Sequence, residues 1–315
     1  MSKFRIAVVG AGSFGQNHVR ILSQMEGVEL VAVVDANLEA ASKYGVRALA
    51  DVQELLSNRQ LDAAVVATPT VTHVDVAARL LEAGVSVLVE KPIAQTSAGG
   101  EKLTSLAKSR GLVVQVGHLE RFNPAVLALE QAVTVPLFFE VHRMSVFTPR
   151  SLDIDVVLDL MIHDLDIVLS LTGAMPEEIR AAGISVLSRK VDIANVRLAF
   201  ASGCIANLTA SRVSTERIRK LRLFQAGEYL SLDYQKQELT RVGVRSGNIG
   251  FEALPVTPGE PLRLELESFI DAVRHGHKPR VDGQQAVNAL RVGEAILAKI
   301  EEHAGLVART LRSRP

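Results

Sequence analysis

Asp and His side chains recur along one otherwise apolar stretch, residues 155–171, at spacings of four, four and three: Asp155, Asp159, His163 and Asp166. On an α-helix these spacings place all four side chains on one face. Carboxylates and an imidazole are costly inside an apolar segment unless they are paired or functional. Three interpretations are open: a solvated helix face, a divalent-metal site, and a histidine that serves as acid or base beside its carboxylate neighbours.

A second candidate for chemistry is Lys91, in the tripeptide Glu90-Lys91-Pro92 at the end of a predicted strand. Its ammonium group could hydrogen-bond a substrate hydroxyl or relay the proton of that hydroxyl. The bond before Pro92 could be cis, which would hold the lysine at a sharp turn. Taken alone, a salt-bridged strand end is the commoner interpretation of such a tripeptide.

A glycine-rich turn, Gly10-Ala11-Gly12-Ser13-Phe14-Gly15, lies between a predicted strand and a predicted helix. In a G-x-G-x-x-G turn the glycines allow a tight bend and close approach of a pyrophosphate to the positive end of the helix. Asp35 ends the next strand, and its carboxylate can accept both ribose hydroxyls and would repel a 2′-phosphate, which predicts NAD rather than NADP. We expect cofactor contacts from Gly10, Gly12, Ser13, Phe14, Gly15 and Asp35.

Further cofactor contacts are expected at the carboxyl ends of two later strands, because ligands of open α/β sheets bind there. Thr68 and Pro69 follow one of these strands, and Glu90 and Lys91 end the other. The predicted nicotinamide site decides between the three interpretations of residues 155–171, since hydride transfer from an alcohol needs a base and not a metal. We therefore assign His163 as the base, tuned by Asp159 or Asp166, keep Lys91 as a candidate catalytic residue, and expect no metal.

The elements that must position these residues follow two patterns. Between residues 4 and 116, short, almost continuously apolar strands alternate with helices, which predicts a doubly wound parallel sheet. After residue 120, four strand-like runs between 179 and 225 lie close enough in sequence for antiparallel pairing. The expected fold class is α/β: an N-terminal Rossmann domain, residues 1–120, and a C-terminal α/β domain with a large open, mostly antiparallel sheet, residues 121–315. The last helix could pack back on the first domain.

Composition narrows the class of protein. Lys and Arg number 35, as do Asp and Glu, so no basic excess favours nucleic acid as a partner. No uncharged apolar run is long enough for a membrane span, and the N-terminus lacks the features of a signal peptide. The one cysteine, Cys204, excludes a disulfide framework within the chain and fits a reducing compartment. We expect a cytoplasmic protein without membrane or nucleic-acid partners.

Three motifs, in this combination and order, resemble the Gfo/Idh/MocA oxidoreductases over essentially the whole length of the chain: Gly10–Gly15, Glu90-Lys91-Pro92, and Asp159-x-x-x-His163-x-x-Asp166. The resemblance implies a cis Lys91–Pro92 bond and a Lys91/His163 pair at the substrate. It also implies that Asp159 contacts the substrate or His163, and that sheet faces pair to give homodimers or homotetramers.

Residues 116–124 and 157–166 resemble a subgroup of that family that oxidises the 3-hydroxyl of UDP-N-acetylglucosamine. The expected substrate contacts include the motif residues Lys91, Asp159, His163 and Asp166. They also include Arg121 and Arg212, because a diphosphate calls for Arg or Lys. Additional cations are available at Arg143, Arg217, Arg219 and Lys220. For Arg212, Arg217, Arg219 and Lys220, which cluster near a strand junction, a solvated basic edge is as good an interpretation. Two alternatives stay open: a dehydrogenase of a free sugar or inositol, and a non-enzymatic sensor of NAD or sugar. The presence of Lys91, Asp159 and His163 argues against a sensor.

Overall fold

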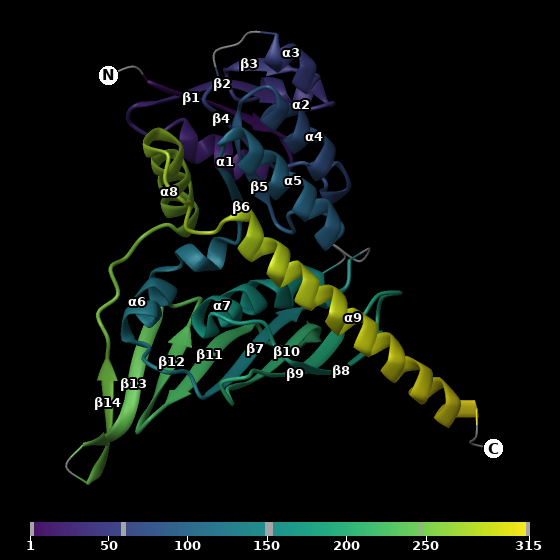
Figure 1. The fold of residues 1–315 in the computed structure, drawn as a ribbon, viewed down its shortest axis with the longest axis vertical. Helices are drawn as coiled ribbons and strands as arrows, with labels where there is room; N and C mark the ends of the chain where they lie inside the picture. The colour runs from purple at the N-terminus through teal and green to yellow at the C-terminus, as the bar shows by residue number, and fades with distance from the viewer. Residues whose placement is uncertain (1–2, 58–60, 149–153, 246, 313–315) are drawn as a thin grey trace. The chain divides into compact units, whose positions relative to one another are not determined.

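The computed structural model describes residues 3–57, 61–148, 154–245 and 247–312, which form two compact units (Figure 1). The first unit comprises Met1–Leu119 and Glu260–Val287, and the second comprises Glu120–Gly259 and Asn288–Pro315. The first unit therefore contains a segment, residues 260–287, that the sequence alone groups with the second domain. The reason is packing: Leu266 and Phe269 of this segment share one apolar core with Phe4 and Ile6.

The first unit is built on a six-stranded, all-parallel sheet, which confirms the predicted Rossmann fold. Strand order reverses between β1 and β4, and ligands of such sheets bind at this reversal. The strands, in spatial order, are β3 (Arg47–Leu49), β2 (Val28–Val34), β1 (Phe4–Val9), β4 (Ala63–Val66), β5 (Ser86–Glu90) and β6 (Val114–Gly117). The helices are α1 (Gly15–Leu22), α2 (Leu38–Ser42), α3 (Val52–Leu56), α4 (Thr70–Glu82), α5 (Ser97–Arg110) and α8 (Pro261–His275).

The second unit contains an eight-stranded sheet in which every neighbouring pair except β7 and β10 is antiparallel, as predicted. Its spatial order is β14 (Asn248–Ala253), β13 (Glu238–Arg245), β12 (Glu228–Asp233), β11 (Ile218–Gln225), β7 (Phe138–Val146), β10 (Ile205–Ser214), β9 (Ile193–Ala199) and β8 (Glu178–Ile184). Burial alternates along these strands, so one face of the sheet meets the core.

Helices of the second unit lie along one face of this sheet (Figure 1). They are the 3₁₀ turn η1 (Leu119–Phe122), α6 (Pro124–Ala132), the π-helical turn η2 (Val157–Met161), α7 (Ile162–Thr172) and α9 (Gly283–Arg312), which is shared with the first unit up to Val287. Leu165 of α7 and Ile296 of α9 join sheet residues such as Val141 and Leu208 in the core.

The expected helix over residues 155–171 differs in one respect that matters for the site. Its first turn is π-helical, with an extra residue per turn, and Asp155 lies ahead of it. The Asp155 carboxylate instead accepts a hydrogen bond from the backbone N–H of Val191 (2.9 Å). The sequence predicts that Asp155, Asp159, His163 and Asp166 share one helix face. This prediction is wrong for Asp155, because that residue precedes the helix.

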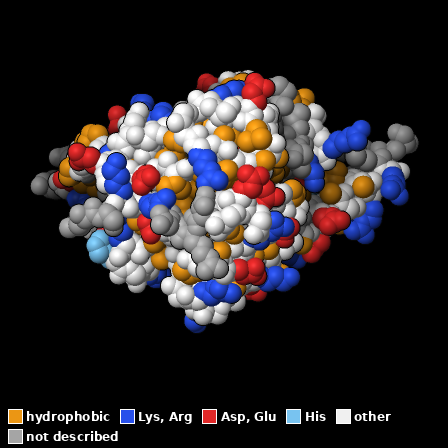
Figure 2. Space-filling view, turned by 90° about the horizontal axis from the view of Figure 1, so that it is seen from above, with side chains coloured by type: hydrophobic (Ala, Val, Ile, Leu, Met, Phe, Trp, Pro, Cys, Tyr) orange, Lys and Arg blue, Asp and Glu red, His pale blue; other side chains and the backbone are white. Residues whose placement is uncertain are grey.

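Figure 2 shows one face of the molecule, on which positive and negative side chains alternate, in keeping with the balanced composition. Within the described ranges, no helix has the length and apolar character that crossing a bilayer requires.

Candidate active site

The glycine turn between β1 and α1 requires two of its glycines for packing and leaves space at the third. Gly10 has φ +102°, and a Cβ atom there would lie 2.5 Å from the carbonyl oxygen of Ala67. A Cβ at Gly15 would lie 1.8 Å from the carbonyl oxygen of Gly10, whereas one at Gly12 would meet nothing within 4 Å. The turn thus offers bare backbone and open space at Gly12, where a pyrophosphate can approach.

The N-terminus of α1 completes this cradle. Phe14 is the N-cap residue, and its side chain makes no capping hydrogen bond to the first N–H groups of the helix. The carbonyl of Ser13 accepts hydrogen bonds from the side-chain amides of Gln16 and Asn17, which hold the loop against the first turn. Backbone N–H groups and the helix dipole favour an anion at such a terminus. The predicted contacts Gly10, Gly12, Ser13, Phe14 and Gly15 therefore suit a dinucleotide pyrophosphate.

Asp35 braces the glycine turn as well as ending β2. One carboxylate oxygen accepts the N–H of Ala11 (2.7 Å), and the other accepts the N–H of Asn37 (2.8 Å). A carboxylate oxygen has two acceptor positions, so each oxygen can accept a ribose hydroxyl in addition. The spacing in the sequence predicts the second role and gives no sign of the first.

His73 connects the ends of two strands. Its ring nitrogens lie 2.8 Å from the carbonyl oxygen of Thr68, after β4, and 2.9 Å from that of Pro92, after β5. Burial lowers the pKa of His73, although both carbonyls act to raise it. The imidazole thus bridges the two strand ends and holds Thr68 and Pro69 beside the Glu90-Lys91-Pro92 segment. The Lys91–Pro92 bond is cis, as the family resemblance implies.

Glu90 is held by a second buried histidine. Its Oε1 lies 2.7 Å from Nε2 of His18, a fully buried residue of α1, and its Oε2 accepts the backbone N–H of Lys91 (3.3 Å). Burial alone would raise the pKa of Glu90, but His18 and Lys91 outweigh it and the pKa is lowered. Glu90 is therefore an anion that orients the Lys91 backbone.

A second buried acid, Glu265, lies close to Glu90. Glu265 of α8 is fully buried, and neither of its carboxylate oxygens has a hydrogen-bond partner among the described residues. Gln115 of β6 donates its side-chain amide to the Glu265 backbone carbonyl (3.0 Å). Burial, followed by the charge of Glu90, raises the pKa of Glu265 well above its usual range. Glu265 is thus a neutral acid beside an ionised one.

In the second unit, His163 and Asp159 are both partly exposed, on α7 and on the π-helical turn η2 respectively. Their neighbour Asp164 is buried and accepts a bidentate pair of hydrogen bonds from Arg143 of β7, from Nε at 2.6 Å and from Nη2 at 2.9 Å. Arg143 also donates to Glu120 (2.9 Å). This bidentate pair fixes the first turn of α7, and with it the backbone of His163, to the sheet.

Arg121 and Asp166, both predicted substrate contacts, contact each other. They are buried, with Nη1 and Oδ2 3.5 Å apart, and Arg121 Nε also lies 3.4 Å from Glu130. Charge pairing within the unit accounts for their burial.

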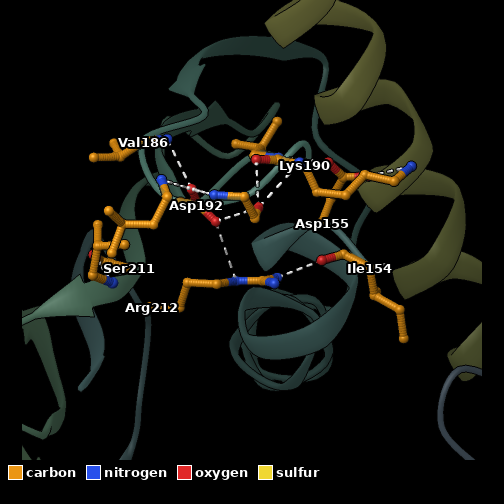
Figure 3. A network of polar contacts seen from close by, with 11 residues as sticks. Ile154, Asp155, Val186, Lys190, Asp192, Ser211 and Arg212 are labelled. Atoms are coloured by element: carbon orange, nitrogen blue, oxygen red, sulfur yellow. Dashed lines mark hydrogen bonds and ion pairs between the residues drawn. The ribbon is translucent and has the colours of Figure 1, made fainter. Parts of the chain in front are cut away.

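Arg212 lies in a separate buried network (Figure 3). Its guanidinium donates to the carbonyl of Ile154 and lies 3.9 Å from Asp192. Burial would raise the pKa of Asp192, but hydrogen bonds from Ser188 and from the backbone of residues 186–188 lower it to about 2. This network holds the turn before β9, so the fold itself explains the position of Arg212.

Cations with solvent access lie at the start of β11. Arg217, Arg219 and Lys220 line a hollow of about 620 Å³ on the second unit. The Nε of Arg219 is buried and donates to none of the described residues, and its Nη1 lies 3.8 Å from Glu120. Burial, then the charge of Arg143, lowers the pKa of Arg219, although Glu120 and Asp164 act to raise it.

Two models of one protein family match the sequence of this chain. Residues 4–118 match the oxidoreductase family with an NAD-binding Rossmann fold, and residues 135–226 match the Gfo/Idh/MocA C-terminal domain. The chain belongs to the Gfo/Idh/MocA family. The predicted membership, fold class, NAD cofactor and dehydrogenase activity are thereby confirmed.

Individual relatives differ in what they act on. A UDP-N-acetylglucosamine 3-dehydrogenase from Acidithiobacillus ferrooxidans is 37% identical over 89% of this chain and 91% of its own length. A solved structure of that enzyme superimposes with a TM-score of 0.91 at 34% identity, covering 96% of this chain and 99% of the other. A scyllo-inositol 2-dehydrogenase from Bacillus subtilis is 27% identical over 92% of each chain.

For this Gfo/Idh/MocA protein, the sequence yields no prediction for four buried residues around Glu90 and His163: His18, Gln115, Glu265 and Asp164. His18 had a detectable signal, since it follows the last glycine of the turn by three residues, on the inner side of α1. Glu265 had none, because its neighbour Glu90 lies far away in the chain. Arg143 was expected only as a possible cation for the diphosphate, and its pairing with Asp164 was not predicted.

Proposed function

We propose that this dehydrogenase oxidises the 3-hydroxyl of UDP-N-acetylglucosamine, with NAD, to a 3-keto nucleotide sugar. The observation that carries the proposal is the likeness to a UDP-N-acetylglucosamine 3-dehydrogenase along 91% of that protein's length. A dehydrogenase of a free sugar or inositol is the second candidate, supported by the weaker likeness to a scyllo-inositol 2-dehydrogenase. We place the reaction in the cytoplasm.

Bound NAD supplies the acceptor for the hydride that leaves the carbon being oxidised. In the proposed mechanism His163 takes the hydroxyl proton, and the C–O single bond becomes a carbonyl as the C–H bond breaks. Lys91 donates a hydrogen bond to the same oxygen and stabilises the negative charge that develops there. Asp159 orients the imidazole or the sugar. The Glu90 anion holds the Lys91 backbone, and the Arg143–Asp164 pair holds that of His163.

The catalytic roles are tested by Lys91→Ala and His163→Ala. Each replacement should lower turnover by about 10²–10⁴-fold, because it removes a group that acts on the hydroxyl proton. NAD binding, measured by calorimetry, should stay within a few fold, since neither role involves the pyrophosphate cradle. Lys102→Ala, an exposed lysine of α5, is the control. Turnover close to that of the unmodified chain in both variants would refute the roles.

The substrate is tested with a panel of UDP-N-acetylglucosamine, free N-acetylglucosamine, scyllo-inositol and myo-inositol, each with NAD and with NADP. We expect NADH absorbance to appear only with the UDP-linked sugar and NAD. Reduction with a free sugar or an inositol alone would favour the second candidate.

We also propose that Arg219 binds the diphosphate of the substrate. Of the cations expected there, Arg121, Arg143 and Arg212 are buried and matched within the fold. Arg219 instead has a side chain that is 33% exposed, against 6% for Arg121, 2% for Arg143 and 7% for Arg212. Its replacement by Met should raise KM for UDP-N-acetylglucosamine about tenfold or more, as expected for loss of a charge-assisted hydrogen bond.

Steady-state kinetics would check this assignment, with KM for NAD as the internal reference. Arg197→Met is the matched control, because Arg197 of β9 is an exposed arginine of the same sheet that does not line this hollow and donates to Asn207 (3.2 Å). Equal changes in both variants would argue against a specific diphosphate contact at Arg219.

A further inference from the structure

Three potential metal ligands converge at the C-terminal end of α8, within the first unit. One oxygen of Asp271 lies 2.8 Å from Nδ1 of His275, and the other lies 2.7 Å from Nε2 of His277. One ligand atom from each residue lies within 4.8 Å of the other two. None of the three belongs to the glycine turn or to the Glu90-Lys91-Pro92 segment.

The local backbone brings the three side chains together. Asp271 and His275 are four residues apart on α8 and so lie on the same face. Gly276 ends the helix in the left-handed conformation, with φ +66°, and the N–H of His277 donates to the carbonyl of Ala272 (3.2 Å). This turn carries His277 back over the last helical turn, where it reaches the carboxylate that His275 also contacts. The arrangement is built from one short contiguous segment and needs no other part of the chain.

Hydrogen bonding around His277 resembles that of a metal-binding imidazole. Its Nδ1 lies 3.2 Å from the carbonyl oxygen of Lys278, while its Nε2 faces Asp271. Histidines that bind metals commonly donate the other ring N–H to a backbone carbonyl or a carboxylate. With Nδ1–H donated to Lys278, Nε2 is the atom left for an ion once its own proton is lost.

The cation next to this cluster, Lys278, is already paired. Its ammonium lies 2.7 Å from the carboxylate of Asp282. A divalent cation held beside His277 would therefore meet no uncompensated positive charge from Lys278.

We propose that Asp271, His275 and His277 form a binding site for one Zn²⁺ ion. Two imidazole nitrogens and a carboxylate oxygen are ligands that zinc takes in tetrahedral sites. The side chains are 56%, 65% and 50% exposed, so water can fill the remaining position. The ion would join the last turn of α8 to the residue that follows it, and it has no part in hydride transfer.

The test is a calorimetric titration of the chelator-treated, tag-free full chain with ZnCl₂. We expect one ion per chain at the tightest site, and affinity at least about tenfold weaker in Asp271→Asn and in His277→Ala, since each loses one of three ligands. His142→Ala is the matched control, because His142 is another exposed histidine beside a carboxylate, 3.7 Å from Glu140. Far-UV circular dichroism verifies that all variants are folded.

The matched control separates this site from loose surface binding, because loose binding would weaken to a similar extent on loss of either histidine. Absence of stoichiometric binding, or an equal loss of affinity in His142→Ala and His277→Ala, would overturn the proposal. Neither result depends on the identity of the sugar substrate.

Discussion

Glu265 is the residue whose burial has the clearest consequence for stability. In the folded chain it keeps a proton that the unfolded chain, with an ordinary pKa near 4.5, has lost at neutral pH. Such a group stabilises the fold fully below the unfolded pKa, and this contribution is lost as pH rises towards the folded pKa, at about 1.4 kcal/mol per pH unit. Glu265→Gln has the shape of the neutral acid and no proton to lose. The free energy of unfolding of Glu265→Gln, relative to that of the unmodified chain, should therefore increase as pH rises above about 4.5.

Thermal unfolding at about pH 5, 6 and 7 measures this difference. Glu267→Gln is the matched control, because Glu267 lies two residues along the same helix, is exposed and pairs with Arg263 (2.9 Å). The melting temperature of Glu265→Gln should rise relative to the unmodified chain with each step in pH, while that of Glu267→Gln should not. A difference that stays constant over the series would mean that Glu265 ionises normally.

At the scale of elements, local patterns predicted the parts of the site that depend on neighbouring residues. The glycine turn, Asp35 and the Lys91 strand end each follow from a strand, a turn and a helix that are adjacent in sequence. The even spacing from Asp155 to Asp166 predicted a regular helix and missed the π-helical turn η2. Hydrophobic periodicity does not show an extra residue in one turn, because the residues around it are apolar on several sides.

Other elements depend on contacts between distant segments, which no local pattern reports. Strand β3 has only three residues, and β12 to β14 carry polar residues that resemble loops until they pair. Helix α8 joins the first unit through Leu266 and Phe269, more than two hundred residues after β1. His18 and Glu265 surround Glu90 for the same reason. The sequence therefore predicted candidate residues for chemistry and missed the residues, such as His18 and Glu265, that surround Glu90.

At the scale of the whole molecule, we propose that the chain forms a homodimer or homotetramer through the sheet of the second unit. Val244, Ile249 and Phe251 of β13 and β14 are 69%, 71% and 75% exposed. Val244 is opposite Ile249 in the hairpin, so these apolar side chains are neighbours. An exposed apolar cluster is a common sign of a protein–protein contact.

The assembly is tested by Ile249→Asp and Phe251→Asp in light scattering coupled to size-exclusion chromatography. The unmodified chain should elute with two or four times the mass of one chain, and either replacement should lower that mass, because a buried unpaired carboxylate opposes association. Val71→Asp, at an exposed apolar residue of α4 in the first unit, should leave the mass unchanged. If the unmodified chain is monomeric, the proposed assembly is excluded. If all variants keep the mass of the unmodified oligomer, the contact lies elsewhere on the chain. Since Ile249 and Phe251 lie outside the proposed catalytic residues, lower mass with unchanged turnover would further show that each chain carries a complete site.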